Sequence, residues 1–189
     1  KSNRGATTPG TLGETADESS LEFMKKLSQQ LKTNKYKFPD VRRTWVPKPM
    51  KGTDWTKKEN LVKYGRPLGM PDFSAKLVQE AIRLVLNAIY EPIFDQLGVS
   101  YGFRPKMGCH NPMLDIQNQT QGMTIALEGD IKGAFNELNH EVFISFLSQR
   151  IQDKNFFNLV LSMCTAGIFD QMQNVRTDSL LGVPQGSIV

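Results

Sequence analysis

Asp130 stands out because of its position in the chain. It follows the run from Thr124 to Gly129, whose apolar residues predict a buried strand. A carboxylate at the end of such a strand can bind a hard cation such as Mg²⁺, and the main-chain carbonyl of Ile131 can add a second oxygen ligand. Two such ions serve phosphoryl transfer, one activating the attacking oxygen and the other stabilising the leaving group. Read alone, Asp130 also fits a helix cap.

Two further segments contain residues suited to a nucleotide site. Phe135 follows Asp130 closely, and a rigid aromatic ring there can wall a sugar pocket and exclude a 2′-hydroxyl; core packing is the competing interpretation. Near the C-terminus, residues 182–186 combine two glycines with Pro184 and Gln185. Glycines let another backbone or a base pair come close, and Gln185 could orient a template or nucleotide. A simple turn explains the same residues.

Positive charge is concentrated in the first third of the chain. The 189 residues carry a net charge of +4, yet residues 1–66 hold 15 Lys and Arg against 7 Asp and Glu. This asymmetry is typical of a surface that faces a polyanion such as RNA, with a solvated mixed-charge surface as the alternative. The candidate phosphate contacts are Arg42, Arg43, Lys48, Lys63, Arg104 and Lys106.

Composition argues against several other classes of protein. No apolar run has the length of a membrane span and no signal-peptide pattern is present, so no membrane partner is expected. Cys109 and Cys164 form no disulfide framework and fit a reducing compartment. Cys109 and His110 lack the spacing of a zinc site.

The apolar periodicity predicts strands that alternate with long helices, and hence a mixed α and β fold. Helical spacing predicts helices over residues 21–31, from Asp72 or Ser74 to Pro92, which ends or kinks the helix, and over 111–121, 140–151 and 156–169. Extended structure is predicted within 37–49, over 66–71 and as a β-hairpin within 168–180. Residues 50–65 are polar and lysine-rich and are expected to form a loop.

The order of the segments is more specific than any one of them. Along the chain come PKP at 47–49, RPLGMP at 66–71, a long helix, YGFRP at 101–105, EGDIKGAF at 128–135 and GVPQGS at 182–187. In this order the blocks resemble the reverse transcriptase of group II introns, and above all the organellar and bacterial intron-encoded maturases. The resemblance extends over nearly the whole chain, including the N-terminal KSNRGATTPGTLG.

The resemblance implies an α+β fold, namely the fingers and incomplete palm of a right-hand polymerase. Residues 1–123 would form the N-terminal extension and fingers, and residues 124–189 a partial palm. The chain contains no tyrosine-x-aspartate-aspartate block, which carries the further catalytic carboxylates of such enzymes. We therefore expect a fragment that is inactive alone, and whether it is an enzyme stays open at this point.

The resemblance also implies roles for particular residues. Asp130 is the expected catalytic metal ligand, and the carbonyl of Ile131 is expected to bind the same metal. Mg²⁺ is the expected cofactor of the parent enzyme; this chain alone could be without a bound metal. Phe135 is the expected sugar gate. The expected contacts to the incoming triphosphate, nucleotide and template are Arg66, Gln185 and Gly186.

The parent activity implied by the resemblance is RNA-directed DNA polymerisation with assistance to intron splicing. The expected partner is intron RNA or another structured RNA, together with a separate chain completing the palm if the enzyme is split. The alternative is a non-catalytic, maturase-derived RNA-binding component of an organellar ribonucleoprotein such as a mitochondrial ribosome, with ribonucleoprotein subunits as partners. The resemblance favours mitochondria as the location, with the bacterial cytoplasm as the alternative.

Overall fold

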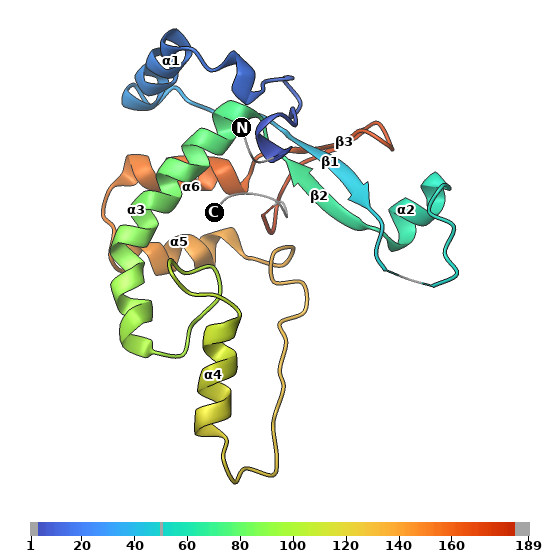
Figure 1. Ribbon diagram of the computed structural model, residues 1–189. Helices are drawn as coiled ribbons and strands as arrows, with labels where there is room; N and C mark the ends of the chain where they lie inside the picture. Colours follow the sequence, from blue (N-terminus) through green and yellow to red (C-terminus); the bar gives the residue numbers. More distant parts are fainter. Residues whose placement is uncertain (1–3, 50, 184–189) are drawn as a thin grey trace. The chain divides into compact units, whose positions relative to one another are not determined.

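The computed structural model describes residues 4–49 and 51–183 (Figure 1). The chain divides into two compact units, one formed by the residues up to Ile82 together with those from Gly133 onward, the other by Arg83–Lys132. The long helix α3 (Phe73–Leu97) begins in the first unit and ends in the second. These units do not coincide with the boundary between fingers and palm at residues 123 and 124, which stays a prediction.

A four-stranded mixed sheet is the frame of the first unit. β1 (Val41–Val46) pairs antiparallel with β2 (Arg66–Met70) and parallel with β3 (Ile168–Asp170). β3 pairs antiparallel with β4 (Val175–Thr177), which gives the strand order β2-β1-β3-β4. The β3–β4 hairpin confirms the prediction for residues 168–180, and together with the helices the sheet confirms the α+β fold class.

Helices supply most of the core of this unit. α1 (Leu21–Lys32), α5 (His140–Ser148) and α6 (Lys154–Cys164) are capped by the side chains of Ser20, Asn139 and Asp153, which accept from helix N–H groups. α6 ends earlier than predicted because residues from Ile168 onward pair with β1. Among the described residues, no helix is long and apolar enough to cross a membrane. The buried hydrophobic side chains are Leu27, Val41, Ala75, Val78, Ile82, Leu147, Ile151, Val160, Met163, Cys164 and Ala166.

The start of the described chain is fastened to the beginning of α3. Asp72 is fully buried, and its carboxylate accepts from the N–H groups of Thr11 at 2.9 Å and Leu12 at 3.1 Å, and from the Thr11 hydroxyl at 3.1 Å. Gly10 has no room for a side chain, because a Cβ there would lie 2.5 Å from atoms of Asp72. Arg42 of β1 donates to the carbonyl of Pro9 at 2.6 Å. The arm is therefore held by α3 and β1 together. We call residues 5–14 the N-terminal arm.

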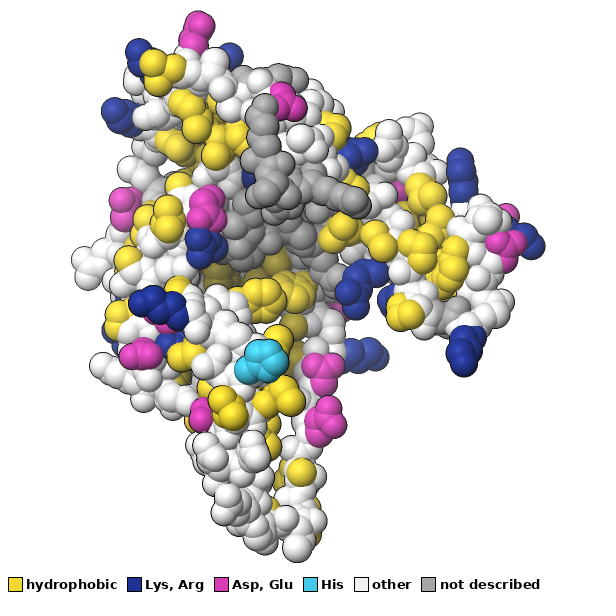
Figure 2. All heavy atoms as spheres, in the orientation of Figure 1, with side chains coloured by type: hydrophobic (Ala, Val, Ile, Leu, Met, Phe, Trp, Pro, Cys, Tyr) yellow, Lys and Arg dark blue, Asp and Glu magenta, His cyan; other side chains and the backbone are white. Residues whose placement is uncertain are grey.

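The lysine-rich segment between β1 and β2, expected to be a loop, contains the helix α2 (Lys58–Tyr64). The Asp54 carboxylate accepts from the Thr56 N–H at 3.1 Å, and the Asn60 amide donates to the Asp54 carbonyl at 2.9 Å. These bonds order the turn that precedes the helix. α2 lies at the end of the β1–β2 hairpin (Figure 1), and Figure 2 shows hydrophobic side chains flanked by Lys and Arg on this lobe.

The second unit contains the C-terminal part of α3 and α4 (His110–Gln119). Pro92 lies inside α3, which continues to Leu97, so the alternative in which the proline ends the helix is wrong. The Arg104 side chain is 5% exposed and donates to the carboxylates of Glu91 at 2.8 Å and Asp95 at 3.1 Å. This buried guanidinium ties the segment after α3 back to the helix.

The strand predicted for Thr124–Gly129 is not formed, so that prediction is wrong. All six residues are exposed, with Ile125 and Leu127 at 79% and 98%, and none pairs with another described strand. A strand needs a neighbour to satisfy its backbone N–H and C=O groups. The apolar pattern predicted that these side chains would be buried. In the described part of the chain, however, no strand pairs with this segment.

Candidate active site

Two of the predicted nucleotide blocks meet in the first unit. The Val183 N–H donates to the carbonyl of Phe135 at 2.7 Å, and the Gly182 N–H donates to the carbonyl of Leu138 at 2.8 Å. Gly182 has a φ of +76°, and a Cβ there would lie 2.5 Å from the Phe135 oxygen and 2.6 Å from the Asn136 oxygen. Only glycine meets both demands. We call this contact between residues 135–140 and 182–183 the junction.

His140 fixes the junction from the other side. Its side chain is buried, and Nε2 lies 2.6 Å from the carbonyl oxygen of Gly182. Since the carbonyl can only accept, Nε2 carries the proton and donates it. The two residues are 42 positions apart, and no local signal in the sequence pairs them. The sequence analysis expected the glycines of residues 182–186 to admit another backbone or a base pair, with a simple turn as the alternative, but it did not identify His140 as a partner.

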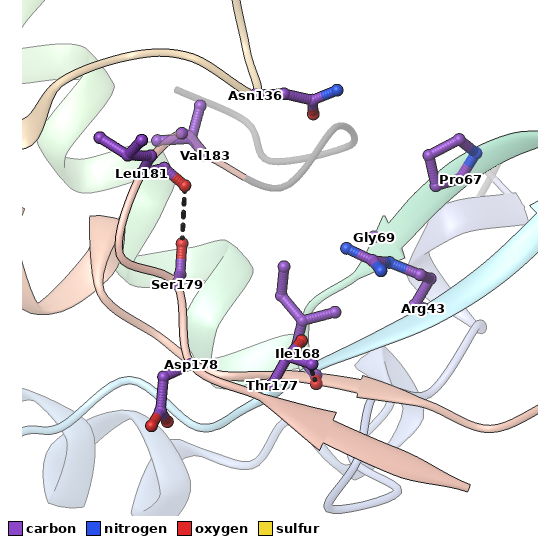
Figure 3. A pocket seen from close by; sticks show the side chains of 11 residues that line it. Arg43, Pro67, Gly69, Asn136, Ile168, Thr177, Asp178, Ser179, Leu181 and Val183 are labelled. Carbon is purple, nitrogen blue, oxygen red and sulfur yellow. Dashed lines mark hydrogen bonds between the residues drawn. The ribbon is translucent and has the colours of Figure 1, made fainter. Parts of the chain in front are cut away.

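A cavity of about 250 Å³ opens beside the junction (Figure 3). One side comes from the β1–β2 hairpin and the other from the junction and the chain that follows β4. Ser179, which is buried, donates to the carbonyl of Leu181 at 3.3 Å and shapes that chain (Figure 3). The lining residues are Arg43, Pro67, Gly69, Asn136, Ile168, Thr177, Asp178, Ser179, Leu181, Gly182 and Val183.

Arg43 is the cation that lines this cavity. Its guanidinium carbon lies 6.0 Å from the ring centroid of Trp45, two residues along β1 and thus on the same face of the sheet. The Trp45 indole N–H donates to the carboxylate of Asp170 at 2.9 Å, and Asp170 also accepts from the Met172 N–H at 2.9 Å. The ring is thereby fixed beside Arg43. A guanidinium held in this way suits the planar recognition of a phosphate or carboxylate.

Asp130 and Ile131 belong to the second unit and are exposed. Within the described residues the Asp130 carboxylate has no hydrogen-bond or ion-pair partner, so its oxygens are free for a ligand. Among all the described residues, no group of three or more His, Cys, Asp or Glu side chains is positioned to hold a metal ion. The chemistry fits a hard cation such as Mg²⁺, which is often held by one or two carboxylates together with substrate phosphates and water.

The remaining predicted nucleotide contacts are placed as follows. Phe135 lies in the junction, with its side chain half exposed. Arg66 is exposed at the first position of β2, where it pairs with Val46, and it does not line the cavity beside Arg43. Gln185 and Gly186 lie outside the described residues. The structure therefore brings together Phe135 and the start of the second block.

Apart from Arg43, which lines the cavity, the candidate RNA contacts fall into two groups. Lys48, Lys63 and Lys106 are exposed cations. Arg42 and Arg104 are engaged inside the protein: Arg42 donates to Pro9 and, at 3.2 Å, to the side chain of Gln171, whereas Arg104 is buried in its carboxylate pair. Internal hydrogen bonds engage both terminal nitrogens of each guanidinium, and the Nε of Arg42 is buried, so a phosphate finds few donors there. The positions of these two arginines thus favour a structural role over RNA binding.

Comparison with known proteins agrees with the order of the blocks. The sequence pattern described as reverse transcriptase (RNA-dependent DNA polymerase) matches residues 46–189. The chain is 39% identical over 188 residues to the group II intron-encoded protein LtrA of Lactococcus lactis subsp. cremoris, covering 100% of this chain and 29% of that protein. It is 36% identical over 189 residues to an uncharacterized 91 kDa protein in the cob intron of Schizosaccharomyces pombe, covering 100% of this chain and 21% of that protein. A third relative is the uncharacterized mitochondrial protein ymf11 of Marchantia polymorpha, 39% identical over 84 residues, which are 44% of this chain and 11% of that protein.

The family match includes β2, the junction and the chain beyond β4, and thus nearly all of the cavity lining. The chain spans less than a third of the length of these relatives, namely 29%, 21% and 11%. Two of these relatives are named after the introns that encode or contain them. The chain belongs to the reverse transcriptase (RNA-dependent DNA polymerase) family, and its relatives include a group II intron-encoded protein.

Proposed function

We propose that this chain supplies the fingers and the first part of the palm of a group II intron-encoded reverse transcriptase that copies RNA into DNA. The observation that carries the proposal is the junction, in which Phe135 and Leu138 are hydrogen-bonded to Val183 and Gly182 beside the cavity lined by Arg43. The arrangement suits a polymerase, because glycine lets the backbone come close to a ligand such as a base pair.

Phe135 is the proposed sugar gate. Its carbonyl is bonded to Val183, and its ring stays half exposed instead of joining the core. Because the backbone on which it stands is fixed, the ring can present a constant steric limit to an incoming nucleotide. We expect it to disfavour a 2′-hydroxyl and hence to select deoxynucleotides.

Asp130 is the proposed metal ligand, and the exposed, unpaired state of its carboxylate supports the assignment. Mg²⁺ bound there would activate a primer 3′-hydroxyl and neutralise charge on the transferred phosphoryl group. Arg66 and Arg43 are the cations that we assign to the phosphates of the nucleotide or template. Gln185 and Gly186 keep their assignment to the nucleotide and template site on the basis of the sequence block alone.

Template or intron RNA is the proposed partner, and the exposed Lys48, Lys63 and Lys106 are the proposed contacts to it. Assistance to intron splicing is proposed from the likeness to a group II intron-encoded protein. We propose mitochondria as the location because the similar proteins include one named as mitochondrial, while the Lactococcus relative keeps a bacterial origin as the alternative.

Since we expect this chain to be inactive alone, primer extension is measured with an enzyme in which this sequence is joined to, or mixed with, the remainder of the palm. With an RNA template, a DNA primer, dNTPs and Mg²⁺, we expect synthesis that stops when the metal is chelated. Phe135→Ala should raise the incorporation of ribonucleotides relative to deoxynucleotides while leaving RNA binding unchanged. Tight RNA binding without any synthesis would contradict the polymerase proposal and favour the non-catalytic RNA-binding alternative.

A further inference from the structure

Both backbone polar groups of Gly182 are held by the segment that leads into α5. Its N–H donates to the Leu138 carbonyl at 2.8 Å, and its carbonyl accepts from His140 Nε2 at 2.6 Å. The third bond of the junction runs from the Val183 N–H to the Phe135 carbonyl at 2.7 Å. Of these three bonds, two join backbone to backbone, and only the one from His140 uses a side chain. A substitution at His140 can therefore remove one bond of the junction without changing the backbone.

The imidazole of His140 has a fixed place at the start of α5. His140 is the first residue of that helix and is 7% exposed. The preceding Asn139 caps the helix, since its side chain accepts from the Val142 N–H at 3.1 Å. The carbonyl of Asn139 also accepts from the Phe143 N–H at 3.0 Å. A ring that is buried beside a capped helix turn has little freedom to change its rotamer, so Nε2 presents its proton in one direction.

The turn that carries Phe135 is closed on itself and fastened at the junction. The Gly133 carbonyl accepts from the Asn136 N–H at 2.8 Å, which closes the turn. The Phe135 side chain is half exposed, so packing fixes its ring only in part. Its carbonyl is bonded to Val183, the residue that directly follows Gly182. A shift of Gly182 is therefore passed on to Phe135 through Val183.

We propose that His140 is a positioning residue for sugar selection: by holding Gly182, it keeps the Phe135 ring where it excludes a 2′-hydroxyl. The inference rests on the proposed function, which assigns Phe135 as the sugar gate. His140 does not line the cavity of the candidate site, whereas Gly182 and Val183 do, so it acts through its neighbours. Gly182 is buried, and without His140 its carbonyl loses a partner that water does not readily replace.

Sugar selection is measured as the ratio of kcat/KM for a deoxynucleotide to that for the matching ribonucleotide, in the enzyme that joins this sequence to the remainder of the palm. His140→Leu keeps a buried side chain but has no donor, and the ratio should fall by about tenfold or more. His140→Gln can present an amide N–H to the same carbonyl, and its ratio should stay closer to that of the wild type than to that of His140→Leu. The control Leu147→Ala truncates a buried side chain near the other end of α5; it should lower stability and leave the ratio unchanged.

Two further measurements separate a positioning role from a general loss of structure. In a Phe135→Ala background, where the gate is absent, His140→Leu should lower the ratio no further, because the two residues act in series. Hydrogen exchange at the Gly182 and Val183 amides should be faster in His140→Leu than in Leu147→Ala, because the junction opens locally in the first variant alone.

An unchanged ratio in His140→Leu, an equal fall in Leu147→Ala, or a further fall in the Phe135→Ala background would each overturn the role of His140 and leave the proposed polymerase standing. If His140→Leu does not fold, His140→Asn gives the same test, because its shorter amide does not reach the Gly182 carbonyl. A Phe135→Ala enzyme with the wild-type ratio would overturn the sugar gate on which the inference rests. A wild-type enzyme that makes no DNA would overturn the proposed function itself.

Discussion

The Val183 N–H lies 2.7 Å from the carbonyl oxygen of Phe135, and this hydrogen bond, together with that from the Gly182 N–H to the Leu138 carbonyl, joins the segment before α5 to the segment after β4. β3 pairs with β1 and with β4, and the chain that leaves β4 leads to the junction. The proposed sugar gate therefore depends on the sheet even though it lies in no strand. The cavity beside it depends on the same pairing, since its lining comes from both sides.

Replacing Gly182 by Ala should disrupt the junction. The new Cβ would meet the Phe135 oxygen at 2.5 Å, and the φ of +76° is strained for any residue with a side chain. Strain of this kind costs about 1–3 kcal/mol in free energy of unfolding, and the clash adds to it. Urea unfolding measures the loss, and RNA-templated synthesis should fall with it.

Gly52→Ala is the matched control for Gly182→Ala. Gly52 has a similar φ of +80°, but nothing lies within 4 Å of the Cβ that would be added. We expect this variant to show the backbone strain alone and to keep its activity. Equal losses in the free energy of unfolding of both variants would mean that the clash with Phe135 does not destabilise Gly182→Ala.

Asp72→Ala should release the N-terminal arm. The substitution removes the buried acceptor of three donors from Thr11 and Leu12, and each donor left without a partner costs about 1–3 kcal/mol unless water reaches it. Hydrogen exchange at the Thr11 and Leu12 amides should become much faster, and limited proteolysis should cut within residues 5–14. The exposed Asp178→Ala is a control for loss of a carboxylate. Unchanged exchange at both amides would show that Asp72 does not hold the arm.

The two cysteines should differ in reactivity. Cys164 is fully buried at the end of α6, and burial raises its pKa to about 11, whereas Cys109 is exposed. Because the thiolate is the reacting form, a thiol reagent at about pH 8 should modify Cys109 first and Cys164 only after unfolding in urea. Cys109→Ser identifies which thiol has reacted, and modification of Cys164 in the folded Cys109→Ser protein would contradict the burial.

The same thiol makes stability depend on pH. The folded protein keeps the Cys164 proton to a higher pH than the unfolded chain, whose thiol has the ordinary value of 9.0. The contribution of Cys164 is therefore fully present below about pH 9 and is lost as the pH rises toward 11. Urea unfolding at several pH values should show this decline, and Cys164→Ala should lack this part of it.

Local signals in the sequence predict the elements that depend on local chemistry. Ser20 caps α1 as the serine before an apolar periodic run suggests, and the β3–β4 turn places Asn174 at a φ of 54°, a value that Asn tolerates. The comparisons confirm the identification as an intron-encoded reverse transcriptase. It could be made from the sequence because it depends on the order of several blocks and not on any single residue.

Features that depend on distant partners were not predictable in the same way. Arg42 reads as an exposed cation, and only the fold supplies Pro9 and Gln171 as its acceptors. Residues 50–65 were predicted as a loop because the only adjacent apolar pair, Leu61 and Val62, stands among polar and lysine residues; both side chains are half-buried in the structure. The close approach of Gly65 to the end of β1 is a tertiary contact, which the local sequence does not indicate. The prediction of a strand at Thr124–Gly129 is wrong for a different reason. The apolar pattern is typical of a strand, but no described strand pairs with this segment.

The most direct test of the proposed function compares Asp130→Asn with Glu128→Gln. Both residues are exposed in the same stretch of chain, and each substitution removes one negative charge at nearly constant size. The measurement is the rate of Mg²⁺-dependent, RNA-templated primer extension by the protein that carries this sequence, with RNA affinity measured beside it. If Asp130 holds the metal, Asp130→Asn should lower the rate at least about a hundredfold without loss of RNA binding, while Glu128→Gln should stay near the wild-type rate. Equal rates for Asp130→Asn and the wild type would contradict the account.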